Sequence, residues 1–87
     1  MRLRHLDIAW RPNTKGHARI GIVVPRFELT AVARNRVRRR VREILRRDLL
    51  NALPPVDLVI RAKRGAYAAR FAELRAELAD ASAHLPR

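Results

Sequence analysis

The sequence contains no cysteine, which excludes disulfide bonds, thiolate catalysis and cysteine-ligated metal centres. Acidic residues are also scarce: eight aspartates and glutamates stand against 20 lysines and arginines, and the net charge is +12. No run of 18 apolar residues occurs, so no membrane-spanning helix is expected. The charged N-terminus lacks the apolar stretch of a signal peptide. We therefore expect a cytoplasmic protein with a polyanionic partner and no membrane association.

The positive charge is concentrated in one short segment. Six arginines occupy nine residues between Arg34 and Arg42, and the first acid, Glu43, comes only after them. Arginine stays protonated at physiological pH, so these side chains cannot relieve their mutual repulsion by losing protons. Nucleic-acid phosphate is the commonest dense negative charge that offsets such repulsion. The cluster therefore favours nucleic-acid binding over a solvated helix face, which would mix both signs of charge.

Three segments have the pattern of β-strands. Residues alternate between apolar and polar from Leu3 to Trp10, and β-branched residues dominate from Ala18 to Val24. A turn at residues 11–16 joins these two segments, which we expect to pair as a hairpin. The third strand, Val56 to Ala62, has a central Leu-Val-Ile run that is typical of a strand buried on both faces.

Two segments have helical periodicity. Thr30 is suited to cap a helix that runs to about Leu50, and we expect this helix to dock through a narrow apolar stripe. The stripe comprises Val37, Val41, Ile44 and Leu45. A closing helix begins near Tyr67 and ends before Pro86, with Tyr67 and Phe71 at core positions. The order strand, strand, helix, strand, helix predicts an α+β fold, an α/β two-layer sandwich with helices on one face of a small mixed sheet.

Other chemistry is poorly supported. A leucine-zipper basic region would need apolar heptads beyond the arginines, but Pro54 and Pro55 end the helix too soon. The three histidines, His5, His17 and His84, lack metal-ligand spacing, and we expect them on the solvated surface. The sequence contains no Ser/His/Asp set, carboxylate pair or glycine-rich phosphate loop. We therefore expect no catalytic residues in the polypeptide.

Several ordered segments together resemble the bacterial ribonuclease P protein component. The family signature is an R-N-x-x-K-R-x-x-R helix about ten residues after an R-x-G-x-x-V strand. The matching segments here are residues 19–24 (RIGIVV) and 31–43 (AVARNRVRRRVRE), followed by 57–62 (DLVIRA) and 71–74 (FAEL). The resemblance covers nearly the whole chain, which we treat as one RNA-binding domain, residues 1–87. Arg38 stands where the family usually has lysine, a change that keeps the charge.

The resemblance implies a specific function. In that family a catalytic RNA removes the 5′ leader of precursor tRNA with magnesium ions, and the protein is an accessory subunit that binds the RNA and the leader. We therefore expect the catalytic RNA subunit and precursor tRNA as partners, with Mg²⁺ bound mainly by the RNA. The expected RNA-binding residues are Arg34, Asn35, Arg36, Arg38, Arg39, Arg42, Arg46 and Arg26. The family also implies a left-handed crossover into and out of the signature helix.

Two features depart from the family pattern. The family begins with a helix that has no counterpart in this sequence, and a truncated product without activity is one reading of that difference. The first strand offers Trp10 as its sole aromatic residue. Trp10 and Phe27 are candidate leader contacts by stacking on bases, and a core position is an equal alternative for each. A structural RNA-binding protein, ribosomal or involved in assembly, is the alternative function.

Overall fold

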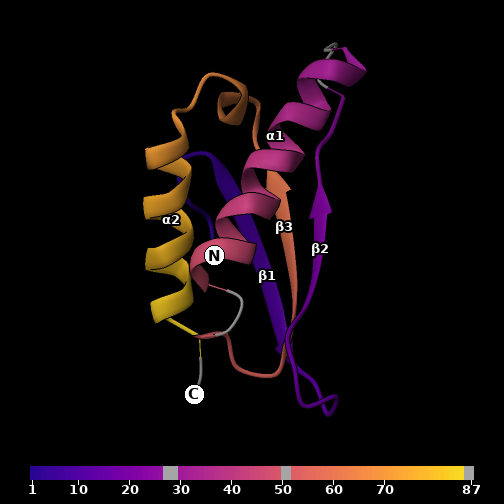
Figure 1. Cartoon of the computed structure of the whole chain (residues 1–87), viewed down its shortest axis with the longest axis vertical. Helices are drawn as coiled ribbons and strands as arrows, with labels where there is room; N and C mark the ends of the chain where they lie inside the picture. Colours follow the sequence, from indigo (N-terminus) through magenta and orange to yellow (C-terminus); the bar gives the residue numbers. More distant parts are fainter. Residues whose placement is uncertain (27–29, 50–51, 86–87) are drawn as a thin grey trace.

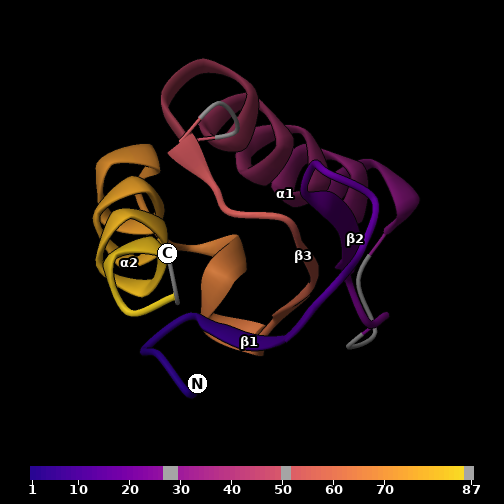
Figure 2. The ribbon, with the colours of Figure 1, turned by 90° about the horizontal axis from the view of Figure 1, so that it is seen from below.

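The computed structural model describes residues 1–26, 30–49 and 52–85, and it has the two-layer architecture expected from the sequence. Its strands are β1 (Leu6–Pro12), β2 (Arg19–Val23) and β3 (Val56–Ala62). Its two long helices are α1 (Ala31–Ile44) and α2 (Phe71–Ala83), and both cover the same face of the sheet (Figures 1 and 2). A π-helical turn, η1 (Leu45–Leu49), extends α1, and a 3₁₀ turn, η3 (Arg64–Tyr67), precedes α2.

The order of the strands corrects the expected hairpin. The sheet runs β1-β3-β2, so β3 lies between the two strands that we expected to pair. β1 is antiparallel to β3 and β2 is parallel to it. The segment 13–18 therefore has to cross two strand spacings, about 10 Å, which a tight hairpin turn cannot do. An Asx turn, in which the Asn13 side chain accepts from the Lys15 backbone N–H at 2.9 Å, shapes this connection.

The connection from β2 through α1 to β3 is a left-handed crossover, which is rare. In Figure 1 the helices lie in front of the sheet, and the chain rises along β2, descends through α1 and rises again along β3, to the left of β2. Parallel strand–helix–strand units are right-handed in about 98% of cases. The left-handed crossover implied by the family resemblance is therefore present, and it carries the arginine cluster.

The strand β3 is buried on one face only, which corrects the expectation from its apolar run. Val56, Leu58 and Ile60 are buried, whereas Val59, on the opposite face, is 45% exposed. Both long helices pack against the first face, so the alternate residues of β3 point away from them. The strand bounds predicted from the sequence, Val56 to Ala62, are confirmed.

The core forms between the inner sheet face and the two helices. The largest fully buried side chains are Leu6, Ile44, Ile60, Leu74, Val37, Val41 and Val56. The predicted α1 stripe is confirmed, since its four residues are all buried. Within the described ranges no helix is both long and apolar enough to cross a bilayer.

The closing helix starts later than the periodicity predicts. Tyr67 belongs to η3, where it packs partly buried against the core and its hydroxyl donates to the Pro25 carbonyl at 2.8 Å. α2 begins only at Phe71, and the side chain of Phe71 is 38% exposed. The expected core position of Phe71 is therefore wrong. The sequence periodicity is counted from Tyr67 as if one helix continued through residues 68–70. The chain is not helical there, so the count assigns Phe71 to the buried side of the helix when it lies on the exposed side.

His5 is another correction, because it is buried rather than solvated. It is 7% exposed, its Nδ1 lies 2.5 Å from Oε2 of Glu77, and its backbone N–H donates to Oε1 of the same carboxylate at 2.7 Å. These contacts tie the segment before β1 to α2, 72 residues along the chain. A buried polar group requires such partners, which sequence spacing alone does not reveal. His17 and His84 are exposed, as expected.

Candidate nucleic-acid interface

The arginine cluster is displayed by a helix whose orientation is set by its opposite side. Thr30 caps α1 by accepting a hydrogen bond from the Ala33 backbone N–H at 3.1 Å. Val37, Val41 and Ile44 are then buried against the sheet at a spacing of three or four residues. The intervening positions must point away from the core. They carry the arginines, so one surface of the molecule is lined by guanidinium groups.

The predicted RNA-binding residues on α1, and Arg46 on η1, lie along this surface. Asn35, Arg36, Arg39, Arg42 and Arg46 are exposed. Arg38 is half-buried, and its Nη1 donates to the side-chain oxygen of Asn35 at 2.8 Å. Arg34 is also half-buried, and its Nε is buried with no hydrogen-bond partner among the described residues. Each Arg and Asn side chain of the signature is thus placed on α1 as the resemblance implies.

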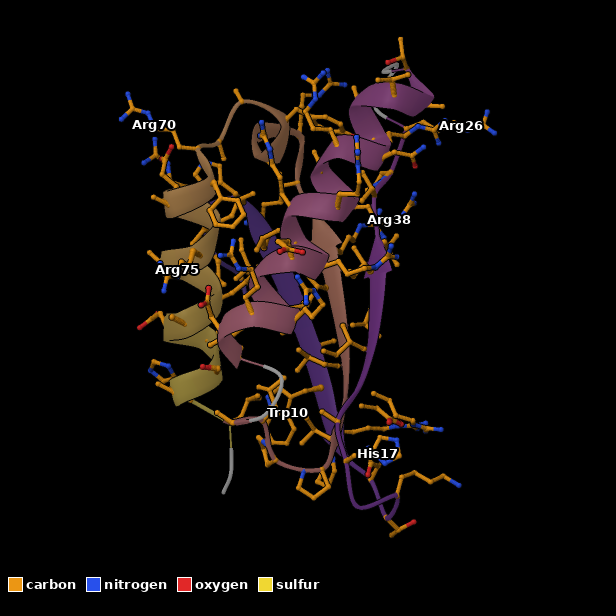
Figure 3. All side chains as sticks on the ribbon, viewed as in Figure 1. Trp10, His17, Arg26, Arg38, Arg70 and Arg75 are labelled. Atoms are coloured by element: carbon orange, nitrogen blue, oxygen red, sulfur yellow. The ribbon has the colours of Figure 1, made fainter. Side chains whose placement is uncertain are left out.

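Two predicted residues lie apart from α1. Arg26 is exposed just beyond β2, and Figure 3 places it at the same edge of the molecule as Arg38. Trp10 is 37% exposed and lies towards the opposite end, the end that also carries His17 (Figure 3). The structure therefore does not bring Trp10 together with Arg26. Phe27 lies outside the described residues, so the predicted leader contact by this residue stays a prediction.

Carboxylates do little to neutralise this surface. The single acid on α1, Glu43, accepts from Nη2 of Arg46 at 2.8 Å and lies 3.7 Å from Nε of Arg47. The hydrogen bond from Arg46 holds the pKa of the Glu43 carboxyl below its ordinary value. Arg46 and Arg47 belong to η1, and among the described residues no carboxylate lies within ion-pair distance of the arginines of α1 itself. These six, called the free arginine row below, are Arg34, Arg36, Arg38, Arg39, Arg40 and Arg42.

Most of the acids that could have opposed the row are engaged elsewhere. Asp57, on the outer face of β3, accepts two hydrogen bonds from Arg19, at 2.7 and 2.8 Å, and one from Asn13 at 3.0 Å. These bonds, with nearby Arg11, hold the pKa of the Asp57 carboxyl well below its usual range. Asp48 pairs with Arg75 of α2 at 2.9 Å. The positive potential over α1 is therefore left uncompensated within the described chain.

Sequence reasoning missed one residue of this surface. Phe71, assigned to the core from its spacing, lies at the edge of a depression of about 380 Å³ whose other walls include Arg36, Arg39 and Arg40. Nη1 of Arg40 donates to the Ala69 carbonyl at 3.3 Å and so ties α1 to the start of α2. An exposed aromatic ring among guanidinium groups is suited to stacking on a base. The signal that could have found it is the start of α2 at Phe71, because the helical period counted from there no longer places Phe71 on the buried side.

No group of three or more His, Asp or Glu side chains in the described part of the chain is arranged to hold a metal ion. The acids there are largely committed to other partners. Of the seven aspartates and glutamates described, six lie within 4.0 Å of an arginine, lysine or histidine nitrogen.

Comparison with known proteins places this geometry in context. A ribonuclease P protein component from Thermus scotoductus is 43% identical over 75 residues, which cover 86% of this chain and 43% of that protein. A ribonuclease P protein component from Aliivibrio fischeri is 41% identical over 63 residues, or 71% of this chain and 53% of that protein. The chain thus spans about half the length of these curated relatives.

Solved structures agree with the sequence relatives. The ribonuclease P protein of Thermotoga maritima superposes with a TM-score of 0.88 at 25% identity, covering 100% of this chain and 83% of that one. The Staphylococcus aureus ribonuclease P protein has the same fold, with a TM-score of 0.80 at 22% identity over 92% of this chain and 73% of that one. A model of the Ribonuclease P family matches residues 1–85. Because that match spans nearly all 87 residues, the chain belongs to the Ribonuclease P family of proteins.

Proposed function

We propose that this chain is the protein subunit of a ribonuclease P, which binds a catalytic RNA and precursor tRNA and assists removal of the tRNA 5′ leader. The observation that carries the proposal is the free arginine row on α1, in a chain of this family. A cation row with no carboxylate partner is unfavourable by itself and becomes favourable against phosphate. The relatives' names support the same role.

In this proposal the protein contributes binding, and the RNA contributes the chemistry. The arginines neutralise phosphates, so that two polyanions, the catalytic RNA and the precursor, approach each other at lower electrostatic cost. Magnesium ions are held mainly by the RNA, and six of the seven described acids already contact an arginine, lysine or histidine nitrogen. Leader contact by Trp10 and Phe27, and a cytoplasmic location, stay predictions of the proposal.

Reconstitution tests the proposal. The chain is combined with the catalytic RNA of a ribonuclease P, and cleavage of a precursor tRNA is measured at limiting Mg²⁺. We expect faster cleavage with the protein than without it, and a reduced gain with Arg36→Gln/Arg39→Gln. A matched control, Arg4→Gln/Arg75→Gln, removes the same charge from arginines that already have carboxylate partners. Cleavage that is unchanged by the wild-type protein would count against the proposal.

A second measurement separates this role from the alternative of a structural RNA-binding protein. RNA that co-purifies with the tagged chain from its native cells is sequenced. One dominant catalytic RNA is expected under the proposal. Predominantly ribosomal RNA would favour the structural alternative.

A further inference from the structure

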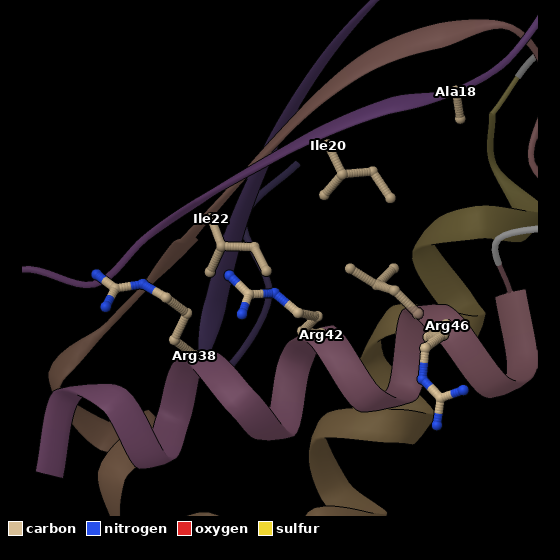
Figure 4. A pocket seen from close by; sticks show the side chains of 7 residues that line it. Ala18, Ile20, Ile22, Arg38, Arg42 and Arg46 are labelled. Carbon is tan, nitrogen blue, oxygen red and sulfur yellow. The ribbon is translucent and has the colours of Figure 1, made fainter. Parts of the chain in front are cut away.

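A groove between β2 and α1 is not accounted for by phosphate binding on the outer side of the helix. It encloses about 350 Å³, at the lower end of the range of about 300–1,000 Å³ typical of sites for small organic molecules. One wall comes from β2 and the residue before it, where Ala18, Ile20 and Ile22 alternate along the chain and face α1 (Figure 4). The other wall is α1 and the start of η1.

The β2 wall of the groove is apolar and incompletely covered. Ile20 and Ile22 pair with Leu58 and Ile60 of β3, so they belong to the helix-covered side of the sheet. Their partners Leu58 and Ile60 are buried, whereas both isoleucines are only half-buried. β2 is also an edge strand of the described sheet, in which β3 is its one neighbour. Its outer backbone groups are therefore available to a ligand.

The α1 wall supplies charge at matched spacing. Arg38 and Arg42 lie one turn apart, about 6 Å along the helix axis, and Figure 4 shows both side chains reaching from α1 towards β2. Neither has a carboxylate partner among the described residues, whereas Arg46, at the end of the groove, turns away (Figure 4) and is paired with Glu43. The groove therefore combines an apolar wall with two guanidinium groups that have no carboxylate partner among the described residues, although Arg38 also donates to the Asn35 side chain.

This combination specifies the chemistry of the occupant. The phosphates of a duplex can be bound by the outward arginines, such as Arg36 and Arg39, and they gain nothing from contact with an apolar wall. A nucleotide that is flipped out of its stack presents both a flat, largely apolar base and a phosphate. Arginine serves both parts, because its planar guanidinium stacks on bases and donates to phosphate oxygens.

We propose that the groove between β2 and α1 holds one unstacked nucleotide of the bound RNA. The base packs on Ile20 and Ile22, and the flanking phosphates contact Arg38 and Arg42. The inference rests on the proposed function only in requiring that the partner is RNA. It adds that the protein binds an RNA helix with an unstacked nucleotide more tightly than a fully paired RNA helix.

The test compares two synthetic RNA hairpins, one with a single bulged uridine and one fully paired, by titration with the full chain at fixed salt. Wild-type protein should bind the bulged hairpin on the order of tenfold more tightly, the scale of one stacked base. The preference should fall towards one in Arg38→Lys/Arg42→Lys, which keeps the charge but loses the planar groups. It should also fall in Ile22→Ser, which keeps both arginines.

The control Arg4→Lys/Arg75→Lys should retain the full preference, because both residues lie outside the groove. Equal affinity of the wild-type protein for the two hairpins would overturn the proposal, as would a preference that survives in both groove variants. Tighter binding of an acidic peptide than of the bulged hairpin, lost in both groove variants, would also overturn it, because a protein segment would then be the occupant. A bulge preference without any gain in precursor cleavage would instead contradict the proposed function alone.

Discussion

The free arginine row predicts how steeply RNA binding depends on salt. If all six arginines neutralise one phosphate each, the slope of log K against log[salt] is about −4 for single strands and about −5 for duplex RNA. Affinity should then fall on the order of a thousandfold between about 50 and 200 mM salt. Arg36 and Arg39 are both exposed and have no carboxylate partner in the part of the chain that the structure describes, and replacing them by glutamine removes two of these contacts. The slope should become shallower by about 1.4 to 1.8.

The assay is a titration of labelled RNA at several salt concentrations, alongside a thermal melt of each variant. The melting temperature should barely change, because exposed substitutions away from the core usually alter stability by about 0.5 kcal/mol or less. Arg4→Gln/Arg75→Gln removes the same charge from paired arginines outside α1 and should leave the slope nearly unchanged. Equal slopes for the two double variants would refute the reasoning, since binding would then follow net charge and not the row.

Three further predictions concern the fold that positions the row. Leu74→Ala should cost about 2–5 kcal/mol in denaturant unfolding, because Leu74 is fully buried, and a loss below about 1 kcal/mol would contradict the assigned core. The hydrogen bonds from Arg19 lower the pKa of Asp57, so this carboxylate adds stability above its unfolded pKa of about 4 that is lost as the pH falls. Asp57→Asn should therefore flatten the acid side of the melting curve against pH, and an unaltered profile would contradict that role. In a double-mutant cycle, His5→Ala and Glu77→Ala should show coupling of about 1–3 kcal/mol, whereas additive losses would mean that the contact is not formed in solution.

The sequence predicted those features that depend on local periodicity. The apolar stripe of α1 was recoverable because a 3.6-residue period both defines the helix and selects its buried side. The bounds of β3 followed from its β-branched run between prolines and a basic turn. The position of the arginine surface followed from the same stripe. Once Val37, Val41 and Ile44 face the core, the remaining residues of α1, among them the arginines, must face away from it.

Non-local features were not recoverable in the same way. Strand pairing joins segments far apart in the sequence, and the alternation within β1 and β2 is equally compatible with a hairpin and with β3 inserted between them. The burial of His5 depends on Glu77, a partner 72 residues away. The exposure of Phe71 depends on the break before α2, and the groove depends on where α1 lies over the sheet. Each of these is decided by packing between elements.

Arginine-specific chemical modification tests the central claim most directly. The chain is treated with a dicarbonyl reagent in the presence and absence of the bound RNA, and the modified sites are located by mass spectrometry. We expect RNA to protect Arg36 and Arg39 on α1. Arg70 and Arg75, which lie on the α2 side of the molecule (Figure 3), should react equally in both states. Protection of Arg70 and Arg75 with α1 still reactive would place the RNA on another surface and contradict the account.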